Sequence, residues 1–210
     1  MTADFIEVGT LLLMLLNPLL IIIYLMDLVQ ELSFPRFVNV LVKAGLISIC
    51  VFTLFAAAGN AIFVYLLQAR FESFQIFGGI IFLIIGIRFV FAGPDALRSL
   101  RGETPENAAG SIAMPIMIGP GTVGASVLAG NRLGTAPAIL MIVGVVVFSL
   151  IVILVLKYVH DVVKPRNEVL VQRYIEIAGR ISALVIGTFS IEMIMSGLTS
   201  WARASQVLIP

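Results

Sequence analysis

MPIMIGPG, residues 114–121, places two prolines and two glycines in the middle of a long apolar segment. Proline has no backbone N–H to donate, and its ring clashes with the carbonyl four residues earlier, so it opens a helix. A second apolar stretch, LLLMLLNP at residues 11–18, is interrupted in the same way by Asn17 and Pro18. In hydrocarbon an opened backbone persists only where protein or a polar cavity satisfies it, so both interruptions predict a polar pocket inside a membrane.

The composition is that of an integral membrane protein. Of the 210 residues 60% are hydrophobic and 12% are charged, and the mean hydropathy is +1.11. The formal net charge of +1 gives no reason to expect a nucleic-acid partner, and the single Cys50 cannot form an intrachain disulfide. The first apolar run is preceded by acidic residues and is too long for a signal peptide, so we expect it to remain as a membrane span.

A helix needs about 20 apolar residues to cross the hydrocarbon core. Six segments qualify, and they are residues 5–26, 37–58, 71–91, 112–129, 136–158 and 175–197. The fourth is the shortest and the richest in glycine and proline. Residues 92–111 predict an extramembrane linker inside a single transmembrane domain, between a first unit at residues 5–91 and a second at residues 112–198.

Positive charges in the short joints predict the topology. The first, third and fifth joints carry seven lysines and arginines, which are Arg36, Arg98, Arg101, Lys157, Lys164, Arg166 and Arg173. The termini and the other two joints carry Arg70, Arg132 and Arg203. This asymmetry predicts a multi-pass protein with the 92–111 linker in the cytoplasm and both termini outside.

The two halves of the chain indicate an internal repeat. At an offset of 102 positions, Asn17-Pro18 aligns with Gly119-Pro120, and at an offset of 101 Gly78 and Gly86 align with glycines of the sixth span. Units of three spans must insert in opposite orientations, so we predict an all-α protein of six transmembrane helices. These form a 3+3 inverted-topology repeat with helices 1 and 4 broken. The alternative is a chance alignment in glycine-rich helices.

The chemistry of the two breaks predicts a binding site. A new half-helix starts beyond Pro120, with Thr122 as its expected cap, and its exposed amides and positive end favour a carboxylate. The carbonyls that the prolines free, with the Asn17 side chain, favour an ammonium group or a cation. One site with both characters predicts a zwitterion such as a small neutral amino acid. For Pro18 taken alone, a structural kink is the alternative.

Ionisable residues elsewhere offer fewer functional candidates. Glu192 in the sixth span needs a partner, a wet pocket or a proton, so it is a candidate for proton coupling. The alternative is that its carboxylate reaches water at the membrane interface. Lys157, His160 and Asp161 are expected to form a charged cytoplasmic corner, in which His160 is expected to be a solvated loop residue without a role. No metalloprotease, phosphate-loop or nucleophile-elbow motif occurs, so we predict no enzyme, cofactor or metal site.

Three stretches resemble the MarC family of six-span inner-membrane proteins: Leu16-Asn17-Pro18, residues 77–82 and residues 114–122. The resemblance covers essentially the whole chain and implies a three-plus-three inverted repeat. It also implies kinship with transporters of small neutral amino acids. Carried over by position, the implied substrate-site residues are Asn17, Pro18, Gly119, Pro120, Gly121 and Thr122. Residues 19–23 are wholly aliphatic where the family usually has glycine and proline, which leaves open whether helix 1 is unwound or only bent.

The sequence therefore predicts a secondary transporter that works by alternating access, with a small-molecule solute, the lipid bilayer and H⁺ or Na⁺ as its partners. A homo-oligomer is a further expectation. Two alternatives stay open at this stage. One is a channel-like protein or ion exporter, and the other is a membrane scaffold or regulatory subunit that transports nothing.

Overall fold

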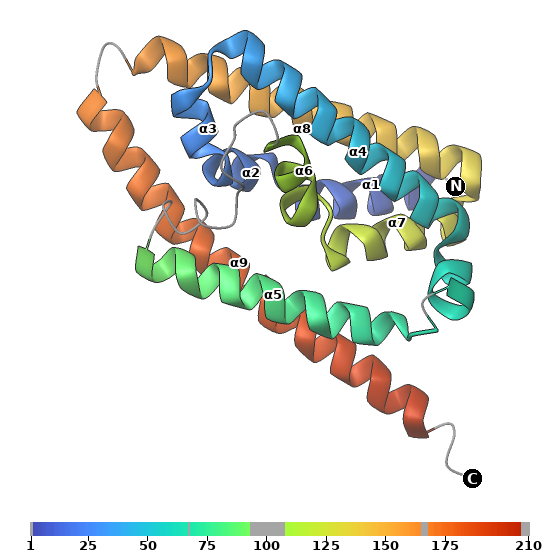
Figure 1. Ribbon diagram of the computed structural model, residues 1–210. Helices are drawn as coiled ribbons and strands as arrows, with labels where there is room; N and C mark the ends of the chain where they lie inside the picture. The colour runs from blue at the N-terminus through green and yellow to red at the C-terminus, as the bar shows by residue number, and fades with distance from the viewer. Residues whose placement is uncertain (1, 67, 93–107, 165–167, 207–210) are drawn as a thin grey trace.

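The computed structural model describes residues 2–66, 68–92, 108–164 and 168–206, and every element in these ranges is a helix (Figure 1). The elements are α1 Thr2–Leu16, α2 Pro18–Tyr24, α3 Met26–Glu31, α4 Phe34–Ala61, η1 Ile62–Leu66, α5 Phe71–Ala92, α6 Ala108–Ser111, η4 Ile112–Met117, α7 Pro120–Leu133, α8 Thr135–Val163 and α9 Glu168–Gln206. Within the described ranges, five segments are long and apolar enough to cross a membrane: Ala3–Tyr24, Phe34–Gly59, Phe71–Arg88, Thr135–Val163 and Ala183–Arg203. The all-helical membrane prediction is confirmed at this level.

The predicted fourth span is not one helix. The segment at residues 112–129 is divided between the π-helical turn η4, a gap at Ile118 and Gly119, and α7. In η4 the Ile118 N–H donates to the carbonyl of Ala113, five residues earlier, at 2.8 Å. Residues 93–107 of the predicted linker lie outside the described residues, and the last four residues of that linker form α6. In the described residues the helical part of the second unit therefore begins at Ala108, before residue 112.

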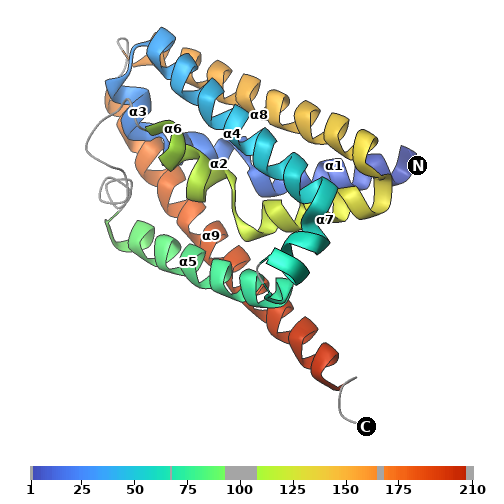
Figure 2. The ribbon, with the colours of Figure 1, turned by 45° about the vertical axis from the view of Figure 1, so that its right-hand side comes forward.

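Each long element of the first half packs against an element of the second half. Helix α1 contacts α7, α4 contacts α8, and α5 lies along α9 (Figures 1 and 2). The α1, α4, α7 and α8 group encloses one large apolar core, which includes Leu12, Phe37, Phe52 and Ile142. The α5–α9 pair lies beside this group, and the C-terminal part of α9 extends past it (Figure 2).

Glycines allow α5 and α9 to approach closely. A Cβ on Gly79 would lie 2.9 Å from the backbone oxygen of Ser190, and one on Gly86 would lie 3.3 Å from the nitrogen of Gly187. Near the other end, a Cβ on Gly197 would lie 3.1 Å from the carbonyl of Glu72. Because small residues let two membrane helices bring their backbones together, these positions explain why α5 and α9 form a tight pair.

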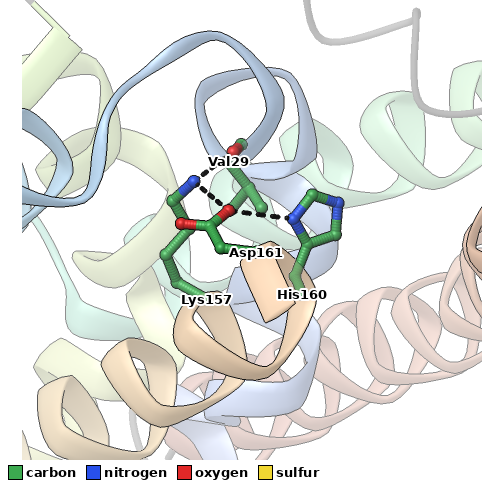
Figure 3. A network of polar contacts seen from close by, with 4 residues as sticks. All are labelled: Val29, Lys157, His160 and Asp161. Carbon is green, nitrogen blue, oxygen red and sulfur yellow. Dashed lines mark hydrogen bonds and ion pairs between the residues drawn. The ribbon is translucent and has the colours of Figure 1, made fainter. Parts of the chain in front are cut away.

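A buried ionic network anchors α3 to the end of α8 (Figure 3). The Lys157 side chain is 3% exposed, and its ammonium donates to the carbonyl of Val29 at 2.5 Å and to Asp161 Oδ1 at 2.6 Å. His160 Nδ1 lies 3.3 Å from the same carboxylate oxygen. The expectation that His160 is a solvated loop residue was therefore wrong, because it lies in α8 with its side chain 9% exposed. Part of the joint predicted after residue 26 forms helix α3, in which Leu28 and Val29 are buried while Gln30 and Glu31 are exposed.

Two contacts show which ends of the helices share a side of the molecule. The bond between Lys157 and Val29 joins the first and fifth joints. At the other end Arg132 pairs with Glu7 at 3.1 Å, which joins the N-terminal segment to the end of α7. Both pairings agree with the relative topology predicted from the positive charges. Which side faces the cytoplasm stays a prediction.

Candidate functional site

The first break is a single residue. Helix α1 ends at Leu16, and Asn17 takes left-handed backbone angles of φ 34° and ψ 83° before α2 begins at Pro18. The Asn17 Oδ1 accepts the N–H of Leu20 at 3.2 Å, so this side chain caps α2. Proline suits the first helical position because its missing N–H would have no partner there. The chain is therefore interrupted here but not unwound beyond Asn17.

The second break is wider and is braced by a side chain. Gly119 is extended, with φ −115° and ψ 169°, and is the N-cap of α7. The buried Thr122 hydroxyl accepts the Gly119 N–H at 2.9 Å and lies 2.9 Å from the carbonyls of both Met117 and Gly119. Thr122 is thus the third residue of α7, not its cap as predicted. Its hydroxyl fixes the bend by satisfying groups that the opened backbone leaves unpaired.

Helix α5 packs directly against this second break. A Cβ on Gly78 would lie only 1.6 Å from Cγ of Pro120, so no side chain larger than hydrogen fits. The sequence placed Gly78 in the repeat but not beside the site. The close approach explains why this position of α5 holds a glycine.

A pocket of about 70 Å³ lies between the two breaks. Its walls come from both halves of the chain, and they are Met14, Leu15, Leu16, Asn17, Leu20, Ile21, Tyr24, Phe82, Ile116, Met117, Gly119, Gly121, Thr122, Ile186, Phe189, Ser190 and Met193. Of the predicted site residues, Asn17, Gly119, Gly121 and Thr122 line this pocket. Pro18 and Pro120 do not line it, but they start the two helices beside it. Glu192 is exposed and lies outside the wall, so its proton-coupling role stays a prediction.

Opposite helix ends meet at the pocket. Helix α1 stops at Leu16, which leaves the carbonyls of Met14, Leu15 and Leu16 without amides from a following turn. Helix α7 starts at Pro120, which leaves the amides of Gly121 and Thr122 without carbonyls from a preceding turn. A helix carries partial negative charge at its C-terminus and partial positive charge at its N-terminus. The pocket therefore offers acceptors on one wall and donors on another.

The Asn17 side chain keeps both acceptor and donor capacity toward the pocket. Its oxygen accepts the Leu20 N–H with one of two lone pairs, and Nδ2 is a donor. Acceptors for an ammonium group come from the backbone at the end of α1. None of the side chains that form the described wall carries a charge, so a ligand that is neutral overall fits best.

Comparison with known proteins agrees with a protein embedded in a membrane. The model of the family described as MarC family integral membrane protein matches residues 2–202. The chain belongs to the MarC family. A UPF0056 membrane protein of Buchnera aphidicola subsp. Baizongia pistaciae (strain Bp) is 22% identical over 202 residues, which cover 94% of this chain and 98% of that protein. No solved structure matches the chain.

Sequence reasoning about this MarC protein missed one whole wall of the pocket. Helix α9 contributes Ile186, Phe189, Ser190 and Met193, which are spaced three, four and seven residues apart and so lie on one helix face. Ser190 is fully buried, and its hydroxyl donates to the carbonyl of Ile186 at 2.6 Å. Apolar residues occur on every side of this part of α9, so periodicity does not distinguish the face toward the pocket from the other faces.

Proposed function

We propose that this MarC protein is a secondary transporter of the inner membrane, which carries a small neutral solute by alternating access. The simplest such solute is a zwitterionic neutral amino acid. The observation that carries the proposal is the pocket between the breaks, where the C-terminal end of α1 faces the N-terminal end of α7. Paired helix interruptions from two halves of a membrane protein are the usual setting of a transporter's binding site.

In this proposal each end of the zwitterion binds to different groups of the pocket. The carboxylate would accept hydrogen bonds from the amides of Gly121 and Thr122 and from Asn17 Nδ2. The ammonium would donate to the free carbonyls of Met14, Leu15 and Leu16. Both interactions place a full charge at a helix end of opposite partial charge, which favours binding without a charged side chain.

The size of the pocket agrees with a small amino acid. A cavity needs roughly 10–15 Å³ to hold one water-sized group, so this pocket of about 70 Å³ has room for roughly five to seven such groups. That is the size of alanine or serine. Larger solutes would require the walls to move apart.

The packing of the helices supports a way for the walls to move. The breaks and their helices form one side of the pocket, while Phe82 of α5 and the α9 residues form the other. Because α5 and α9 pack tightly on each other, we propose that they move as one body against the α1, α4, α7 and α8 group. In a 3+3 inverted repeat, this relative motion would open the pocket to each side in turn.

Counterflow in proteoliposomes tests the proposal. Vesicles loaded with unlabelled alanine should accumulate labelled alanine in a saturable manner, measured with and without imposed pH and Na⁺ gradients. Gly121→Leu should abolish counterflow, because a Cβ on Gly121 already lies 3.2 Å from the Leu15 side chain and the rest of the new side chain would fill the pocket.

Gly144→Leu is the matched control, since a Cβ on Gly144 of α8 meets nothing within 4 Å. This variant should transport like the wild type. If none of glycine, alanine and serine shows saturable counterflow, the carrier proposal is contradicted. Flux that rises linearly with concentration would instead indicate a channel.

A further inference from the structure

We infer that the α9 wall of the pocket is an aliphatic side-chain subsite, and that Met193 sets the length of the side chain it accepts. The inference rests on the proposed function and names the solute class more narrowly, as neutral amino acids with a short aliphatic side chain. It assigns the roles of amino-acid backbone and side chain to different walls. The breaks hold the charged ends, and α9 with α5 holds the side chain.

The first support is the chemistry of this wall. Ile186, Phe189 and Met193 of α9 face the pocket together with Phe82 of α5. The polar member of the α9 face is Ser190, and its hydroxyl donates to the carbonyl of its own helix at 2.6 Å. Apolar groups that line this wall favour burial of a methyl or methylene group of the solute.

The second support is the position of Met193 relative to the donors. Its Sδ lies 3.9 Å from the place that a Cβ on Gly121 would occupy. Met193 therefore reaches from α9 to the first turn of α7, next to the amides that would bind the carboxylate. A solute held there would direct its side chain toward the α9 face, and Met193 would limit the space beyond it.

The same wall argues against a cation site in this part of the pocket. Cations such as Na⁺ and Ca²⁺ bind oxygen ligands, whereas Ile186, Phe189, Met193 and Phe82 have none in their side chains. The free carbonyls lie at the other wall, at the end of α1. An aliphatic group is thus the chemistry that α9 recognises best.

Competition counterflow tests the subsite. Labelled alanine is exchanged in proteoliposomes against unlabelled glycine, alanine, valine or leucine. In the wild type, alanine should compete better than glycine by about tenfold, the order expected for one buried methyl group, and leucine should compete worst. Met193→Ala should improve the competition by leucine, relative to that by alanine, by about tenfold or more. The truncated side chain leaves room for the extra carbon atoms of leucine.

Met195→Ala is the matched control, since Met195 lies on the same helix, is 56% exposed and does not line the pocket. It should leave the order of competitors unchanged. Met193→Leu keeps the volume and should restore the wild-type order, which separates a size effect from misfolding. If Met193→Ala still exchanges alanine but leucine competes relative to alanine as it does in the wild type, the subsite is overturned. Absence of saturable counterflow of glycine, alanine and serine in the wild type would instead overturn the proposed function.

Discussion

The two breaks share an Xaa-Pro signature but differ in how far they open the chain. At Asn17-Pro18 one left-handed residue separates α1 from α2, and its own side chain caps the new helix. At Gly119-Pro120 a π-helical turn precedes a two-residue gap, and Thr122 braces the bend. Proline decides where each helix stops. The residues around it decide how much backbone is exposed, and which polar groups it offers.

The difference also divides the chemistry of the pocket. The first break contributes mainly acceptors, at the C-terminal end of α1, and the second contributes donors, at the N-terminal end of α7. The second break also depends on another helix, because Gly78 of α5 receives Pro120. We therefore expect substitutions near the second break to affect both stability and transport. Substitutions at Asn17 should affect mainly the affinity for the solute.

The largest effect is expected from Gly78→Leu. The new side chain would occupy the space of Pro120 and force α5 away from the second break, which should destabilise the protein by about 3 kcal/mol and abolish transport. Thermal unfolding in detergent and counterflow measure the two effects. Gly144→Leu is the control and should change neither, and a Gly78→Leu protein with wild-type stability would contradict the packing described for Pro120.

Lys157→Met should cost about 1–3 kcal/mol, because it leaves the buried carbonyl of Val29 without a donor and frees α3 from α8. The change tests whether the helices after the first break need this anchor. Thermal unfolding gives the stability, with Lys43→Met, an exposed lysine of α4, as the control. If the two lysine variants unfold at the same temperature, the network in Figure 3 does not anchor α3.

Thr122→Val should cost about 1–2 kcal/mol, because the Gly119 N–H and the Met117 carbonyl lose their hydroxyl partner in a buried place. Alanine counterflow should fall together with the stability, since the bend at the second break would no longer be fixed. Thr122→Ser retains the hydroxyl and should retain most of both properties. Equal transport by the valine and serine variants would show that the hydroxyl does not hold the second break.

Asn17 is expected to give the smallest change in stability. Asn17→Ala removes a cap and places alanine at positive φ, which should cost about 1 kcal/mol, whereas Asn17→Gly should cost only a few tenths. Both variants lose Nδ2, so both should raise the half-saturating alanine concentration in counterflow. An unchanged value for Asn17→Gly would remove Asn17 from the contacts with the solute.

The membrane-spanning helices were predictable because long apolar runs determine them, as at α5, where the expected residues 71–91 became Phe71–Ala92. The breaks were predictable because proline acts locally. The buried position of Lys157 was not, because it depends on α3 packing over the end of α8. The α9 wall was not predictable either, since Ile186 and Met193 are as apolar as their lipid-facing neighbours and only the tertiary structure distinguishes them.

Solute protection of a cysteine in the pocket tests the central claim most directly. Gly121→Cys is made in a Cys50→Ser background, and its reaction with a small water-soluble thiol reagent is followed with and without alanine. A pocket that binds the solute at the α7 amides predicts that alanine slows the reaction in a saturable manner, while Gly144→Cys in the same background is unaffected. The same reaction rate at Gly121→Cys with and without alanine would contradict a solute site between the two breaks.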